Sequence, residues 1–201
     1  MQADGVESFG IHYHYIICTL LLKYNIMKLS IAVLLLFCSS AASAQLADSL
    51  KQQLLKDWKR AKAYTQEYLD AIPKEQFNFR AQDSVRTFAQ QMIHLAQGTV
   101  SLMNAGTDKK VPDIINRRGL EQTNLSADSV IFFVNLSYDF AIEALQEFDL
   151  NKHAEKVKRG NFNETRLAWI MKAFEHQTHH RGQTTIYIRL LGIKPPNEKL
   201  F

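Results

Sequence analysis

The chain has 201 residues, of which 46% are hydrophobic and 22% charged, and its formal net charge at pH 7 is +4. This charge is modest and dispersed, and no basic run alternates with aromatic residues, so the composition speaks against nucleic acid as a partner. Both cysteines, Cys18 and Cys38, lie near the N-terminus. The chain beyond them has no thiol for a disulfide or a metal site, and it must fold on its apolar core alone.

Residues 27–44 have the pattern of a secretory signal peptide. A lysine follows Met27, an apolar run occupies residues 29–37, and an A-x-A triplet ending at Ala44 precedes Gln45. The apolar run is about half of the ~20 residues that a membrane helix requires, which favours cleavage over a retained anchor. We expect cleavage near Ala44, export to the periplasm or the medium, and no stable membrane span afterwards.

Residues 1–26 stand upstream of this complete signal, and we interpret them as a mis-called or untranslated extension with Met27 as the initiator. Cys38 raises the alternative of a lipoprotein, but the bulky Phe37 occupies the position where lipoprotein processing requires a small residue. Residues 45–201 then form the mature protein, which has the size of one ordinary domain.

Helical periodicity is strong in the mature region, and strand signals are nearly absent. We expect helices at about 46–71, 83–105, 126–148 and 164–191. Their ends are marked by residues that cap or stop helices, namely Pro73, Asp83, Gly106, Ser126 and Gly192. A long polar connection (107–125) separates the second helix from the third, and a short one (151–163) precedes the fourth. The pattern predicts an all-α four-helix bundle, in which the long connection could cross the bundle.

Three histidines fall in one window of the fourth helix, His176, His179 and His180. At 100° per residue, His176 and His180 lie on the same stripe as Trp169 and other core-like residues, whereas His179 lies off that stripe. Two inward imidazoles at positions i and i+4 can chelate one metal ion.

His94, in the second helix, is the candidate for a third ligand. Its own helical line holds small or polar residues, which leave room beside an imidazole; these are Thr87, Gln91, Gly98 and Ala105. His153 lies in a connection and has no comparable support. The spacing leaves a second interpretation open, in which neutral buried histidines bond to carbonyl groups and hold no metal.

The stretch HQTHHRGQTTIYIRLLGIKPP (176–196) resembles the last helix of the DinB/YfiT-like superfamily of metal-dependent proteins. The segment PKEQFNFRAQDSVRTFAQQMIHLAQG (73–98) is similar to the family's second-helix region. The resemblance implies a DinB/YfiT-type bundle with a long second-to-third connection. It also implies a divalent metal site formed by His94, His176 and His180. Relatives often have glutamate where this chain has Gln177, which puts in doubt any mechanism that uses that carboxylate.

Three neutral imidazoles leave positions on the ion free, as in a catalytic site, and zinc or nickel suits such ligands. The resemblance therefore implies a metal-dependent hydrolase or thiol transferase acting on a small molecule; the alternative is a bundle that binds a ligand or metal without turnover. Gln183 and Tyr187 flank the inward stripe and could orient a ligand or simply pack. Arg181 fits a salt bridge or a helix-connecting contact. No general acid or base is evident, and a homodimer is compatible with the sequence but not required by a heptad seam.

Overall fold

The computed structural model describes the backbone of residues 4–201 and the side chains of residues 23–30, 34 and 45–201. Most of the predicted signal peptide, residues 27–44, lies outside the described side chains, so its targeting role stays a prediction. Among the residues described, no helix combines the length and the apolar character that crossing a membrane requires.

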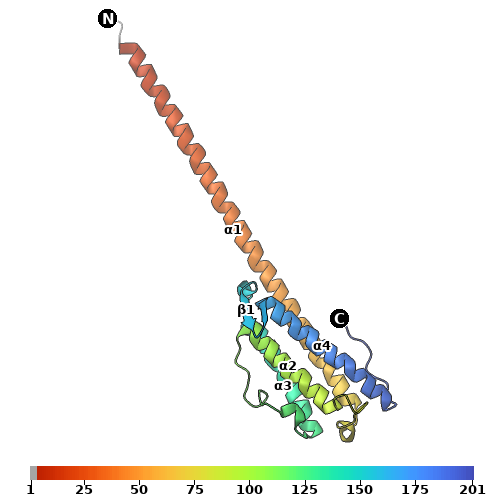
Figure 1. Cartoon of the computed structure of the whole chain (residues 1–201). Coiled ribbons are helices and arrows are strands. Elements are labelled where there is room, and N and C mark those ends of the chain that lie inside the picture. Colours follow the sequence, from red (N-terminus) through yellow and green to blue (C-terminus); the bar gives the residue numbers. More distant parts are fainter. Residues whose placement is uncertain (1–3) are drawn as a thin grey trace. The chain divides into compact units, whose positions relative to one another are not determined.

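The chain divides into two compact units, Met1–Ala47 and Asp48–Phe201. The long helix α1, Asp4–Ala71, contributes its residues from Asp48 onward to the second unit. That unit also contains three further helices, α2 (Phe88–Thr107), α3 (Ala127–Glu147) and α4 (Arg166–Leu190) (Figure 1). Short 3-10 helices lie in the connections, at Lys74–Gln76 (η1), Leu120–Gln122 (η2) and Leu150–Lys152 (η3). The predicted all-α four-helix bundle, with its long connection between the second and third helices, is confirmed.

The core of the bundle surrounds Trp58 of α1, whose side chain is fully buried. Its ring meets Tyr138 of α3 edge-on at a centroid distance of 5.9 Å and Phe174 of α4 at 5.4 Å. Edge-to-face packing of this kind adds to the free energy gained by burying aromatic surface. Helix α2 contacts both α3 and α4. The helices that carry the histidines are thus held against one common core.

The start of α2 differs from the sequence prediction. The N-cap is Thr87 rather than Asp83, because Thr87 and Gln90 form a reciprocal capping box, with hydrogen bonds of 3.1 and 2.9 Å. The predicted stop at Gly106 is also wrong, since α2 continues to Thr107 and is capped by Asp108 at φ +60°. The predicted Ser126 cap of α3 is confirmed, because its side chain accepts a hydrogen bond from the backbone of Ser129.

A two-stranded hairpin precedes α4, where the sequence predicts only a polar link. Strand β1, Lys156–Arg159, pairs antiparallel with β2, Phe162–Thr165. The two-residue turn begins at Gly160, whose φ of +57° suits the first position of a tight hairpin turn. The Gly160–Asn161 pair is a recognised hairpin signal. The flanking residues are nearly all polar and exposed, so the sequence lacks the apolar alternation that indicates strands.

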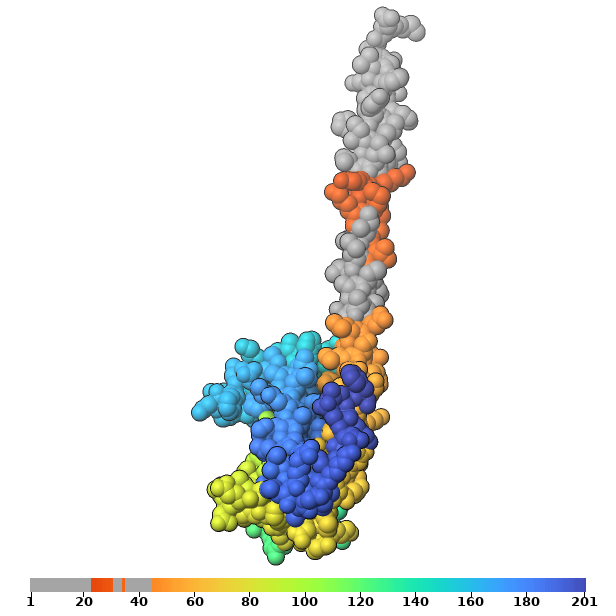
Figure 2. Space-filling view, turned by 90° about the vertical axis from the view of Figure 1, so that its right-hand side faces the viewer, coloured from red at the N-terminus to blue at the C-terminus, as the bar shows by residue number. Residues whose placement is uncertain are grey.

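The C-terminal segment after α4 runs along α1 (Figure 2, dark blue against orange). Lys199 forms an ion pair with Glu67, and the Arg60 guanidinium donates to the Lys199 carbonyl at 2.5 Å. The chain leaves α4 through Gly192, whose φ of +75° confirms the predicted helix stop.

Candidate metal centre

The close approach of α2 to α4 depends on a glycine. A Cβ atom placed on Gly98 would lie 2.1 Å from Cε1 of His176, well inside van der Waals contact. The second helix therefore leaves the space that the His176 ring occupies. Gly98 is one of the small residues on the His94 line predicted to leave room beside an imidazole, and the ring that occupies the space at Gly98 is that of His176.

The structure brings His94, His176 and His180 together. Their ring centroids are 4.3 Å apart for His176 and His180, 4.5 Å for His94 and His180, and 5.4 Å for His94 and His176. Each ring offers one nitrogen such that all three nitrogens lie within 4.8 Å of one another. Three nitrogens at this spacing could hold one metal ion, since zinc–imidazole bonds are about 2.0–2.1 Å long.

The orientation of the His94 ring is set by Glu121, a residue that no sequence pattern distinguishes from its neighbours. Nδ1 of His94 lies 3.0 Å from one Glu121 carboxylate oxygen, and Arg86 pairs with the other at 2.6 Å. Arg86 also approaches Nδ1 of His94, at 3.3 Å, but the shorter carboxylate contact assigns the Nδ1 proton. A proton on Nδ1 leaves the Nε2 lone pair free for a metal, the arrangement of carboxylate–histidine–zinc triads.

Two glutamines hold the His180 ring. Gln91 and Gln183 contact Nδ1 of His180 at 2.8 and 3.1 Å, and Gln91 also donates a hydrogen bond to Gln183. Nδ1 is thereby used within the protein, and Nε2 is the nitrogen left to bind a ligand. The His180 side chain is almost completely buried, so the ring has little freedom to turn away.

His176 carries an unused buried nitrogen. Its Nδ1 atom is shielded from solvent and has no hydrogen-bond partner within the part of the chain that the structure describes. Leaving a buried polar group unsatisfied costs about 1–3 kcal/mol. A cation held by this nitrogen would give it a partner, and three imidazole donors within 4.8 Å of one another are a set that fits a metal.

Burial also keeps two of the rings neutral. Burial, followed by the nearby His180 and His94, lowers the pKa of His176 to about 4. Burial and His94 likewise lower the pKa of His180 to about 4, against the opposing hydrogen bond to Gln183. Both imidazoles are therefore neutral at pH 7, the form in which histidine binds metals.

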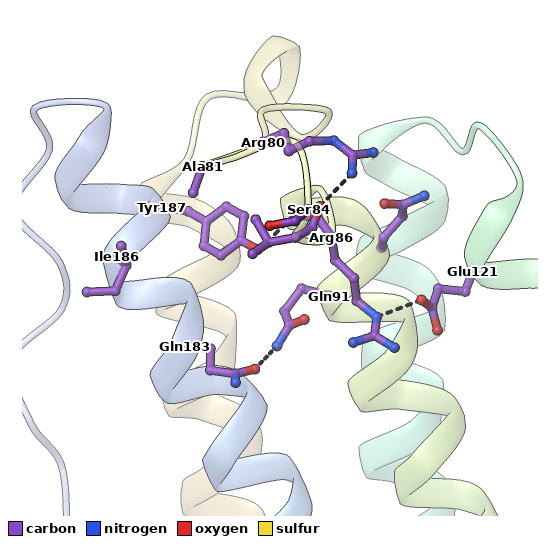
Figure 3. Close-up of a pocket in the computed structure, with 11 residues that line it drawn as sticks. Arg80, Ala81, Ser84, Arg86, Gln91, Glu121, Gln183, Ile186 and Tyr187 are labelled. Atoms are coloured by element: carbon purple, nitrogen blue, oxygen red, sulfur yellow. Dashed lines mark hydrogen bonds and ion pairs between the residues drawn. The ribbon is translucent and has the colours of Figure 1, made fainter.

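Figure 3 shows a cavity of about 700 Å³ whose lining includes side chains that contact the histidine rings. It is lined by residues of α2, α4 and the connections before α2 and α3, among them Arg86, Gln91, Glu121, Gln183 and Tyr187. Because the two glutamines and Glu121 also contact the histidine rings, a small molecule in this cavity would lie next to the cluster. Gln183 and Tyr187, singled out in the sequence, both line the cavity.

Other polar residues of the histidine window do not join the cluster. His179 is exposed, and its ring lies edge-on to His180, with centroids 4.9 Å apart, while its Nε2 contacts Gln183. Its nitrogens do not belong to the group of three that could share an ion. Gln177 is fully buried and accepts hydrogen bonds from Tyr138 at 2.8 Å and Arg181 at 3.0 Å. The Gln177 side chain thus belongs to a buried network and not to the group of three imidazoles.

Arg181 connects helices, one of the two roles predicted for it. Its guanidinium lies over the Tyr64 ring of α1 at 4.5 Å and contacts the Thr65 hydroxyl at 3.4 Å. No carboxylate pairs with it among the described residues, so it forms no salt bridge. His153 lies apart from the cluster, where its Nδ1 contacts the Leu150 carbonyl at 2.9 Å.

Residues 44–200 match the sequence model of the DinB family. The fold is similar to a crystal structure of a DinB-like protein from Bacillus cereus ATCC 10987, with 21% identity, a TM-score of 0.63, and coverage of 74% of this chain and 97% of that chain. It is also similar to the DinB-like protein YjoA from Bacillus subtilis, with 15% identity, a TM-score of 0.56, and coverage of 74% and 96%. At these identities the likeness concerns the fold alone. No curated protein matches the chain significantly.

Proposed function

The chain belongs to the DinB family, and we propose that it binds a divalent metal ion through His94, His176 and His180. The observation that carries this proposal is the convergence of the three imidazole nitrogens within 4.8 Å of one another. The unsatisfied Nδ1 of His176 supports it, as do the low pKa values of His176 and His180. We propose zinc or nickel as the ion, because imidazole ligands suit both.

We propose further that the site acts on a small molecule, as a metal-dependent hydrolase or a thiol transferase. When bound to three neutral imidazoles, such an ion retains open positions and can lower the pKa of a bound water or thiol, or polarise a carbonyl. The cavity beside the cluster has a volume of about 700 Å³, within the range of small-molecule sites. Export, if the signal peptide is used, favours hydrolysis, because low-molecular-weight thiols are scarce outside the cytosol.

The surrounding side chains would hold the metal ligands in position and would not transfer protons. Glu121 holds His94, and Gln91 and Gln183 hold His180. The Tyr187 hydroxyl donates to the Arg86 carbonyl at 2.7 Å, and burial raises the pKa of Tyr187. Its hydroxyl is therefore part of the cavity wall and stays protonated at neutral pH.

A binding protein without turnover is the second candidate. The observation that favours it is the engagement of Glu121, the carboxylate nearest the cluster, with both His94 and Arg86. Gln177, where relatives have an acid, is neutral and buried away from the cluster. Neither side chain is free to act as a general base.

Turnover separates the two candidates. The purified protein, loaded with zinc or nickel, would be screened against esters, amides and thiol acceptors before and after removal of the metal with a chelator. An enzyme would lose activity with the metal and regain it on reloading. Stoichiometric metal binding without turnover on any substrate class would favour the binding protein. Activity that is indifferent to the metal would contradict the proposal.

A further inference from the structure

A second cavity reaches His176 from the opposite end of the α2–α4 pair. Its volume is about 480 Å³, and its lining includes Leu102, Phe162, Trp169 and His176. Leu102 follows Gly98 by one helical turn on α2, and Trp169 precedes His176 by about two turns on α4. The first cavity lies at the other end of the cluster, beside Gln91 and Gln183. The three histidines are therefore flanked by two separate cavities.

We propose that the second cavity binds a neutral aromatic group of the ligand whose polar end coordinates the metal. This inference rests on the proposed metal site, and it narrows the class of small molecule to one with an aromatic ring beside its metal-binding group. The argument depends on the β1–β2 hairpin, because that hairpin supplies the outer wall of the cavity.

The aromatic wall is fixed in place. The Trp169 indole donates a hydrogen bond from Nε1 to the Val157 carbonyl of β1 at 3.1 Å, which ties the hairpin to α4 and fixes the plane of the ring. Phe162 of β2 meets Trp169 edge-on, with centroids 6.4 Å apart and planes at 88°. A ring inserted here would pack against the exposed Phe162 ring and the part of the Trp169 indole that lines the cavity.

Phe162 presents an accessible aromatic ring at the edge of this cavity. Its side chain is 65% exposed on a hairpin whose other residues are nearly all polar, and Figure 2 shows this segment (light blue) projecting from the bundle. The Phe162 ring is therefore available to contact a ring of the ligand. Trp169, by contrast, is 6% exposed and is held by the core and the hairpin.

The charge of the lining argues against an anionic group, and its apolar and aromatic side chains, Leu102, Phe162 and Trp169, favour an uncharged one. The cavity is also lined by Glu164, Glu175 and Lys172, so its ionised side chains sum to one negative charge. An anionic tail would be repelled. The first cavity differs, because it contains Arg80 and Arg86 against Glu121 and suits a polar or anionic group. The two ends of the cluster thus favour different chemistry, and the apolar end is the one at the hairpin.

The test compares two hydroxamates that bind zinc through the same oxygen atoms. Isothermal titration of the purified, zinc-loaded protein with benzohydroxamate and with acetohydroxamate gives the contribution of the phenyl group. We expect benzohydroxamate to bind roughly 10- to 100-fold more tightly, as burial of a ring implies. Phe162→Ser should remove most of that difference and leave acetohydroxamate affinity unchanged. Phe132→Ser is the matched control, since Phe132 is also an exposed phenylalanine but lies on α3; this variant should keep the difference in affinity between the two hydroxamates.

Three results would overturn the inference. The first is equal affinity for the two hydroxamates. The second is tighter binding of benzohydroxamate that persists in Phe162→Ser but is lost in Ile186→Ser, because this result would place the phenyl ring in the first cavity. The third is a change of oligomeric state in Phe162→Ser with hydroxamate affinities intact, since Phe162 would then be a contact between copies. Failure of the protein to bind zinc or acetohydroxamate at all would instead refute the proposed metal site, and this inference with it.

Discussion

Gly98 of α2 and His176 of α4 are in such close contact that any side chain at position 98 would overlap the imidazole, with Cβ only 2.1 Å from Cε1. This contact makes the position of one proposed ligand depend on a residue that binds nothing itself. It links the packing of the bundle to the geometry of the histidine cluster.

Gly98→Ala should therefore weaken metal binding. The added methyl group must displace the His176 ring from its place near His94 and His180, and we expect zinc affinity to fall by about tenfold or more, equivalent to ~1.4 kcal/mol. Competition with a chromogenic chelator measures the affinity. Gly182→Ala is the matched control, because a Cβ at Gly182 meets nothing within 4 Å. Equal zinc affinity in the two variants would show that the contact does not set the site.

Glu121→Gln should reduce metal affinity by about 10- to 100-fold, the usual effect of removing a carboxylate that orients a histidine ligand. The amide is isosteric, so the change removes the charge that faces Nδ1 of His94 while keeping the volume. Glu147→Gln, which removes an exposed partner of Lys109, is the control for a lost surface ion pair. If zinc affinity is the same in both variants, Glu121 does not support His94.

The stability of the metal-free protein should fall as the pH is lowered from about 6.5 towards 4. The pKa values of His176 and His180 are about 4 in the folded chain and 6.5 in the unfolded chain. Between these values the unfolded state binds more protons, so acid favours unfolding, by up to about 1.4 kcal/mol per pH unit for each histidine. Above pH 6.5 both histidines are mainly neutral in the folded and the unfolded chain, so neither adds to the pH dependence of stability.

Urea unfolding at several pH values, with circular dichroism as the probe, measures this slope. The double variant His176→Gln/His180→Gln is the comparison, because it lacks both titrating groups. A slope between pH 6.5 and 4 that is identical in the two proteins would contradict the assigned pKa shifts.

Gln177→Ala should destabilise the fold and leave the metal content of the folded protein unchanged. The substitution removes the acceptor for two buried donors, the Tyr138 hydroxyl and the Arg181 guanidinium. Because the Thr65 hydroxyl remains 2.6 Å from the Tyr138 hydroxyl and 3.4 Å from the Arg181 guanidinium, we expect a loss of about 1–3 kcal/mol rather than the cost of two unpaired donors. Urea unfolding gives the loss of stability, and elemental analysis gives the metal content of the folded protein. Loss of metal with unchanged stability would instead place Gln177 at the cluster.

The sequence predicted the helices and the inward histidines because both follow from a 3.6-residue period. His176 and His180 share a stripe by geometry alone, and Ser126 and Gly192 are located by cap chemistry. The inclusion of His94 required more. The small and polar residues on its helical line, Gly98 among them, made His94 the candidate for the third ligand, and the family resemblance implied the same set of three.

The remaining features depend on tertiary contacts that leave little trace in the sequence. Glu121 lies in a long polar connection, where no periodicity distinguishes it from its neighbours, and only the fold brings it to His94. Thr87 displaces Asp83 as the cap of α2 because its partner Gln90 completes a capping box. The hairpin had one usable signal, Gly160–Asn161, but its exposed strands carry no apolar alternation.

Elemental analysis of the purified protein tests the metal site most directly. After dialysis against metal-free buffer, we expect about one zinc or nickel ion per chain in the parent protein and in the His179→Ala control, whose ring lies outside the cluster. His94→Ala, His176→Ala and His180→Ala, each checked for folding by circular dichroism, should retain none. A folded parent protein without metal, or stoichiometric metal in any of the three ligand variants, would contradict the account.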